Sequence, residues 1–187
     1  KNPGAEVIIA EGADGYDTLH LFEERGFRVI AEKYGVGLVD LNRTDSEPKV
    51  DADFLITDTI MYPSLLKDAF VISLPLLRKH ESHGITGSLS NMLGTYPGKH
   101  YKGFFSRTKN KLVGPIKYQI HDIIKSKMPE LALVDAHEQG FILAGQPLEV
   151  DKQATKLLGI DWRSVGHLRL IDEGLKPKKA DIDLARM

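Results

Sequence analysis

The chain has 187 residues, enough for one domain with a sizeable core. Its 25 Lys and Arg residues nearly balance its 26 Asp and Glu residues, so the charge gives no support to a nucleic-acid or membrane-surface role. The absence of cysteine excludes disulfides, thiolate nucleophiles and cysteine-ligated iron–sulfur clusters from this chain, and it suits a reducing compartment. No apolar run approaches the roughly 20 residues that span a bilayer. We therefore expect a cytoplasmic protein that binds neither nucleic acid nor membrane.

The first third of the chain alternates between strand and helix patterns. Residues 7–10 form an apolar run typical of a strand, and Asp17 or Thr18 is placed to cap a following helix. The helical pattern ends at Gly35, and residues 36–41 predict a second strand. Two apolar strands joined by helix predict parallel pairing with a right-handed crossover.

The rest of the chain continues this mixed pattern. The polar composition of residues 42–52 predicts a loop, and the apolar run 70–74, which Pro75 ends, predicts a buried strand. Hydrophobic spacing gives the later elements, which are a β-rich segment at 53–62, strands at 131–135 and 140–145, and helices at 116–128, 150–158 and 162–171. Asp151 is expected to cap the helix that begins there.

These elements predict an α/β fold with a mixed, mainly parallel sheet flanked by helices in three layers. We expect a single domain over residues 1–175 and a polar C-terminal tail over 176–187. The sequence begins with Lys1 rather than Met, so we also expect an N-terminal segment upstream in a longer protein.

Residues 70–101 are the most informative stretch. Basic, imidazole and amide side chains follow the predicted strand and alternate with glycines, and such a segment is costly to order unless it is used. Its candidate groups are Arg78, Lys79, His80, His83, Asn91, Lys99, His100 and Lys102. The stretch therefore predicts a site without naming a reaction.

Ligands in open α/β sheets bind beyond the carboxyl ends of the strands. The candidate residues of this chain follow predicted strand ends, so we expect them at one edge of the sheet. The first strand ends at Glu11 and Gly12, the strand at 70–74 leads into the basic stretch, and the strand at 131–135 ends in Asp135. The glycine-rich turn after Glu11 opens a helix and predicts either an anion site or an ordinary strand-to-helix turn. If the strands are parallel neighbours, these ends converge.

Two histidines in this stretch offer two kinds of chemistry. His80 and His83 predict a divalent metal site with Asp135 as a further ligand, or ordinary hydrogen bonds in a loop. His80 equally suits acid–base or anion-binding work, and Arg78 suits a clamp on phosphate or carboxylate. The remaining histidines His20, His121 and His167 fall in amphipathic helices and are expected to be structural or solvated.

The same stretch resembles the signature of domain-of-unknown-function family 362. The matching residues are Pro75, His80, Gly84, Thr86, Asn91 and Gly94, and segments resembling the family extend in the same order from about Val7 to Asp161. Leu76 and Ser90 stand where the family has lysines, and Arg78 replaces another lysine. The resemblance implies an α/β fold, a site in this stretch and Thr86 as a ligand-binding residue. Relatives carry ferredoxin-like modules, which this chain cannot hold without cysteine.

Two functions remain open. The first is an enzyme that binds a small anionic ligand at the strand ends, with or without metal assistance. Its catalytic residues would be His80 and Asp135, and its ligand-binding residues would be Glu11, Gly12, Arg78, His83, Thr86 and Asn91. The second is a non-catalytic accessory or binding protein for a redox partner, which the missing family lysines motivate.

Overall fold

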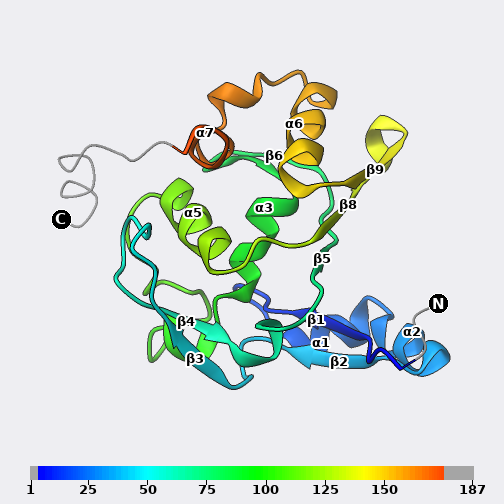
Figure 1. Ribbon diagram of the computed structural model, residues 1–187. Helices are drawn as coiled ribbons and strands as arrows, with labels where there is room; N and C mark the ends of the chain where they lie inside the picture. The colour runs from blue at the N-terminus through cyan, green and yellow to red at the C-terminus, as the bar shows by residue number, and fades with distance from the viewer. Residues whose placement is uncertain (1–3, 175–187) are drawn as a thin grey trace.

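The computed structural model describes residues 4–174 and shows a mixed α/β protein (Figure 1). At its N-terminal end, β1 (Ile8–Glu11) pairs in parallel with β2 (Gly37–Asp40). The crossover consists of α1 (Thr18–Glu24), which Asp17 caps, and α2 (Phe27–Tyr34), which ends at Gly35 in the left-handed conformation. The predicted strands, helix ends and parallel pairing of this part of the chain are confirmed, because caps and glycine turns depend on interactions within a few residues.

A hairpin of two short strands follows. In it, β3 (Ser46–Lys49) pairs antiparallel with β4 (Ile60–Pro63), and the 3₁₀ turn η1 (Ser64–Leu66) comes next. The prediction of a loop over 42–52 is therefore wrong. Polar residues and Pro48 are tolerated in β3 because it has a neighbour on only one side and needs no donor on the other.

The third sheet has the order β5–β8–β9. The pairing of β5 (Ile72–Ser73) with β8 (Leu131–Ala136) is parallel, and that of β8 with β9 (Phe141–Gly145) is antiparallel. The predicted burial of the strand at 70–74 is wrong, since Ile72 and Leu74 are 47% and 62% exposed. Leu133 and Ile142 on the same face of the sheet are also exposed, so the apolar composition of a strand did not by itself predict burial.

The stretch 75–101 is not a loop but a hairpin and a string of short helices. The hairpin pairs β6 (Arg78–His80) with β7 (Gly84–Thr86), and Gly84 supplies the positive φ of its turn. The segments that follow are α3 (Ser88–Asn91), η2 (Met92–Thr95) and α4 (Gly98–Tyr101). In Figure 1, α3 lies in the middle of the molecule, with α5, α6 and β8 around it.

The later helices confirm the apolar spacing. They are α5 (Ile116–Ser126), α6 (Pro147–Leu157) and α7 (Gly166–Glu173), with the 3₁₀ turns η3 (His137–Gln139) and η4 (Trp162–Ser164) between them. The predicted last helix is thus split at Val165. None of the helices in the described part of the chain is long and apolar enough to cross a membrane.

The prediction of one mainly parallel sheet in three layers is not confirmed. The described residues form four small sheets, of which one is parallel, two are antiparallel and one is mixed. One hydrophobic cluster nevertheless joins them, from Leu41 after β2 to Leu168 in α7. Short strands end before they can pair widely, so helix packing rather than one continuous ladder holds the molecule together. The predicted tail at 176–187 lies outside the described residues.

Candidate functional site

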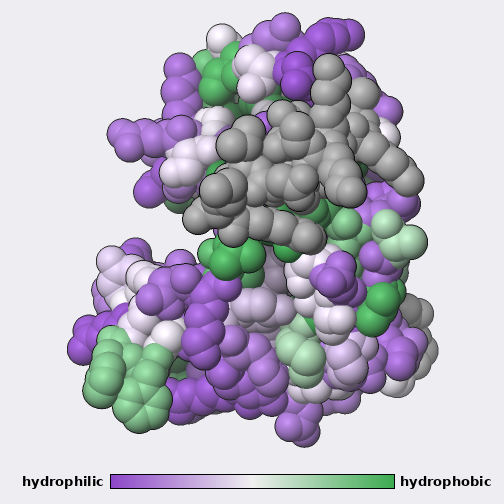
Figure 2. All heavy atoms as spheres, turned by 90° about the vertical axis from the view of Figure 1, so that its left-hand side faces the viewer, coloured by the Kyte–Doolittle hydropathy of each residue, from purple (hydrophilic) through white to green (hydrophobic). Residues whose placement is uncertain are grey.

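A cavity of about 710 Å³ collects most of the residues that the sequence singled out. It lies where the end of β1, the β6–β7 hairpin and the α3–η2 segment meet. From the predicted set it is lined by Glu11, Gly12, His80, His83, Thr86 and Asn91. Seen from the side in Figure 2, the molecule has a mostly hydrophilic surface that is hollowed at mid-height. We call the 710 Å³ space the central cavity.

Glycine at position 12 is required by the wall of the central cavity. A Cβ atom on Gly12 would lie 2.0 Å from the carbonyl oxygen of Gly94, so no side chain fits there without moving the backbone. Gly12 follows β1 and Gly94 lies in η2, and these two segments are far apart in the sequence. Their close approach brings Glu11 to the site, where its Oε1 atom accepts a 2.8 Å hydrogen bond from the Gly12 N–H.

A buried lysine stabilises the same wall of the central cavity. The Nζ atom of Lys109 donates to the carbonyl oxygens of Gly12, Gly94 and Leu93 at 2.9, 3.0 and 3.4 Å. Burial lowers the pKa of Lys109 to about 8, so the ammonium form still prevails at pH 7. Sequence analysis missed Lys109, because it lies in a polar stretch where nothing distinguishes it from the exposed Lys111.

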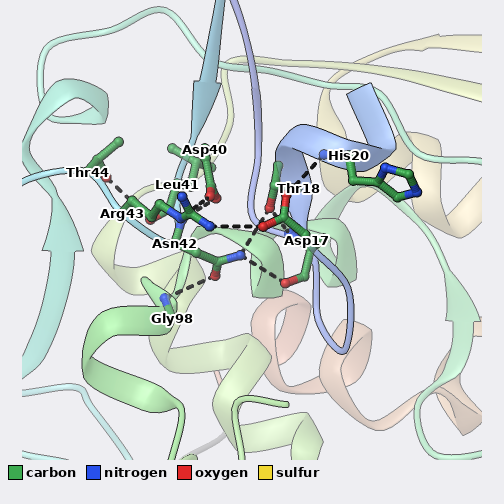
Figure 3. A network of polar contacts seen from close by, with 10 residues as sticks. Asp17, Thr18, His20, Asp40, Leu41, Asn42, Arg43, Thr44 and Gly98 are labelled. Atoms are coloured by element: carbon green, nitrogen blue, oxygen red, sulfur yellow. Dashed lines mark hydrogen bonds and ion pairs between the residues drawn. The ribbon is translucent and has the colours of Figure 1, made fainter. Parts of the chain in front are cut away.

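A second network holds the glycine-rich turn of residues 12–17 in place (Figure 3). Buried Asn42, just after β2, donates from Nδ2 to the carbonyl oxygen of Ala13 and to Oγ1 of Thr18, at 2.9 and 3.2 Å. Its Oδ1 atom accepts a 3.0 Å hydrogen bond from the Gly98 N–H at the start of α4. One amide therefore ties β2, α1 and α4 together behind the central cavity.

Replacing Asn42 with alanine should lower the free energy of unfolding by about 2–3 kcal/mol, because it removes three buried hydrogen bonds. Urea unfolding followed by circular dichroism measures the loss. The matched control is Asn110→Ala, whose Oδ1 atom accepts from Gly103 at an exposed site, and there we expect a change within about 0.5 kcal/mol. Equal losses in the two variants would contradict the role given to Asn42.

His80 and His83 lie with their rings stacked, 3.7 Å between centroids. The Nδ1 atom of His83 lies 2.7 Å from the carbonyl oxygen of Ile85, which can only accept, so Nδ1 carries the proton. The Nδ1 atom of His80 accepts from the Ser82 N–H at 3.2 Å, so the proton of neutral His80 is on Nε2. Burial and the neighbouring His80 lower the pKa of His83, which keeps it neutral at pH 7.

Two predicted site residues do not line the central cavity. Asp135 pairs through its backbone with the Pro75–Leu77 segment, so the two strand ends meet as expected. Its carboxylate, however, is 54% exposed and binds the N–H and Nδ1 of His137 at 2.9 and 3.0 Å. Arg78 is exposed in β6.

The predicted metal ligands are only partly assembled. His80 and His83 are in contact, and Asp135 does not join them at the central cavity. Across residues 4–174, no three His, Asp or Glu side chains are grouped so that they could hold a metal ion. Metal assistance therefore stays a prediction, and its third ligand would have to come from elsewhere than this set.

Comparison with known proteins identifies the family of this chain but no activity or ligand. The model of the family described as Domain of unknown function (DUF362) matches residues 1–153. No curated protein and no solved structure matches the chain. The matched range contains every residue of the central cavity, and all the residues by which the sequence resembled this family except Gly84 line that cavity. The chain belongs to the DUF362 family.

Proposed function

We propose that this protein is an enzyme that binds a small anionic molecule in the central cavity and moves a proton on it. The observation that carries the proposal is the meeting of His80, His83, Glu11 and Asn91, from three separate segments, around one cavity. A cavity on which a few polar groups from separate segments converge is the usual form of a ligand site.

The two imidazoles supply complementary chemistry. With its Nδ1 proton held by Ile85, neutral His83 has an unprotonated Nε2 that is able to accept a proton. Neutral His80, with Nδ1 already accepting from Ser82, has an Nε2–H that is able to donate to an anionic oxygen. His83 is thus the candidate base and His80 the candidate donor.

Polar groups around the imidazoles suit an anion at one end of the ligand. The Lys109 ammonium adds positive charge through its field, since its three hydrogen bonds go to backbone carbonyls. Asn91 uses Nδ2 for a 3.1 Å hydrogen bond to Ser73 and has a second amide hydrogen to offer. Glu11 and Asp14 lie beside Lys109 and offset part of its charge, which favours a ligand that is not anionic throughout.

A thermal-shift screen tests the proposal. The compounds are small carboxylates, phosphate-bearing metabolites and divalent metal salts, which also test metal assistance. A ligand at a hundred times its Kd adds about 2.7 kcal/mol of stability, which raises Tm by several degrees. The shift should disappear in His80→Asn and His83→Asn.

The control is His20→Asn, which removes an exposed imidazole on α1, outside the central cavity. It should respond as the wild type does. A shift that survives in both cavity variants would contradict the site. If no compound shifts Tm, the non-catalytic accessory role for a redox partner becomes the better account.

A further inference from the structure

A second cavity, of about 520 Å³, lies on the other side of His83. Three segments enclose it, namely the hairpin turn at 81–84, the start of α5 and residues 163–169. They are packed closely, because a Cβ atom on Gly84 would lie 3.1 Å from Val165, and one on Gly166 would lie 3.1 Å from the stem of Lys117. We call this space the α7 cavity.

The α7 cavity is rich in positive charge. Lys117, Arg163 and Arg169 line it, against one carboxylate, that of Glu81. The guanidinium of Arg163 lies 4.6 Å from the centroid of the Trp162 ring, which orients the cation without neutralising it. No ion pair of these three side chains with a carboxylate is found within residues 4–174.

His167 is the unusual group in the lining. It is 0% exposed, and neither of its ring nitrogens has a hydrogen-bond partner within the described residues. Its ring meets that of His83 edge to face, 6.1 Å between centroids. Burial, with a smaller effect from His83, lowers the pKa of His167 to about 3, so at pH 7 the ring has one N–H donor and one acceptor nitrogen. A buried polar group without partners is costly, which points to a partner that binds in the cavity.

The N-terminus of α7 opens at the same place. Val165 is the N-cap and supplies no side-chain hydrogen bond, so the N–H groups of the first turn stay available. Gly166 and His167, the first residues of this eight-residue helix, both line the cavity. The positive end of the helix dipole therefore adds to the field of the three cations.

We propose that the α7 cavity is a phosphate site, in which Lys117, Arg163, Arg169 and the first turn of α7 hold the anionic oxygens and the ring N–H of His167 donates to one of them. A phosphate oxygen accepts this N–H and so gives a partner to the ring nitrogen that faces the cavity. Three cations and the positive end of a helix suit a doubly charged tetrahedral group better than a singly charged carboxylate. The cavity is larger than a phosphate ion needs, which favours a phosphomonoester over free phosphate.

Calorimetric titration of the intact chain at constant ionic strength tests this site. The probes are inorganic phosphate, glycerol 3-phosphate and sulfate. We expect the phosphomonoester to bind and Arg163→Met and Arg169→Met each to raise its Kd by about tenfold or more. Both side chains are exposed, so neither variant depends on refolding the core around His167. Sulfate has the same tetrahedral oxygens but no ester group, so it should bind no more tightly than inorganic phosphate.

Two controls separate this site from the central cavity. Arg107→Met removes an exposed arginine elsewhere and should leave Kd unchanged. Asn91→Ala changes the central cavity and not the α7 cavity, which Asn91 does not line, and should also leave Kd unchanged. Tighter binding of glycerol 3-phosphate than of inorganic phosphate identifies a phosphomonoester as the source of the group, and equal binding identifies free phosphate.

Three results would overturn the proposal. The first is no heat of binding with either phosphate probe. The second is binding that Arg163→Met and Arg169→Met leave intact, or that Asn91→Ala removes, which would assign the phosphate to the central cavity. The third is sulfate binding more tightly than both phosphate probes, which would make this a sulfate site rather than a phosphate site.

Discussion

Replacing Asp151 with alanine should lower the free energy of unfolding by about 3 kcal/mol at pH 7, because it leaves two buried N–H groups without an acceptor. The carboxylate of Asp151, inside α6, accepts from the N–H groups of Ser88 and Leu89 at 2.6 and 2.9 Å and so caps α3. A Cβ on Gly87 would lie 2.7 Å from Asp151 Oδ1, so glycine there permits the approach. Urea unfolding of wild type and variant gives the difference.

The same variant should show a pH dependence of known sign. Burial raises the pKa of Asp151 from 3.8 to about 6, so the folded protein holds this proton more tightly than the unfolded chain does. Its contribution to stability is full below pH 3.8 and is lost as pH rises to 6. The gap between wild type and Asp151→Ala should therefore be about 2 kcal/mol wider at pH 4.5 than at pH 7.

Asp17→Ala is the matched control, since Asp17 caps α1 at an exposed site. The hydrogen bond from the His20 N–H lowers the pKa of Asp17, so its contribution is present at neutral pH and lost as pH falls. We expect a smaller loss of stability than for Asp151→Ala and the opposite trend with pH. Parallel trends in the two variants would show that the Asp151 carboxylate is not buried in this way.

Replacing Lys109 with methionine should lower the free energy of unfolding by about 3 kcal/mol, because three buried carbonyl oxygens lose a charged donor. Methionine keeps much of the stem, so the change reports on the ammonium rather than on packing. Because those carbonyls belong to Gly12, Leu93 and Gly94, the loss should also loosen the wall of the central cavity. Urea unfolding measures the first effect, and amide hydrogen exchange at Gly94 measures the second.

Lys111→Met provides the comparison two residues further along the chain. Lys111 is exposed, and its replacement should change stability by no more than about 0.5 kcal/mol. If Lys109→Met were equally mild and left exchange at Gly94 unchanged, the ammonium would not be what holds β1 and η2 together.

The candidate site was predictable where its residues follow one another in the chain. His80, His83, Thr86 and Asn91 lie within a dozen positions, and residue chemistry identified all of them except Thr86, which the family resemblance added. The turn after Glu11 was predictable from its glycines and the cap that follows. Asp135 was harder to assign, because a strand end fixes where a backbone goes and not which way its last side chain points.

Long-range contacts decided the rest. Asp151 was expected to cap its own helix, but α6 begins at Pro147 with Gln146 as its N-cap, and Asp151 instead caps α3, about 60 residues earlier. No local pattern could show this, since an aspartate near a helix start looks the same whichever N–H groups it meets. Burial of Lys109 and His167 is likewise a property of the neighbours that surround them.

The sequence by itself determined the family, the βα segments of the first third, the amphipathic helices and the stretch that carries the site. These depend on interactions within a few residues of each other, such as caps, glycine turns and hydrophobic spacing. Only the tertiary structure decided that the strands form four small sheets and that His83 lines two cavities. It also decided that Gly12 lies against Gly94, with Lys109 bound to the carbonyl oxygens of both. Those features depend on which distant segments pack together, and packing is set by the shape and volume of the whole core.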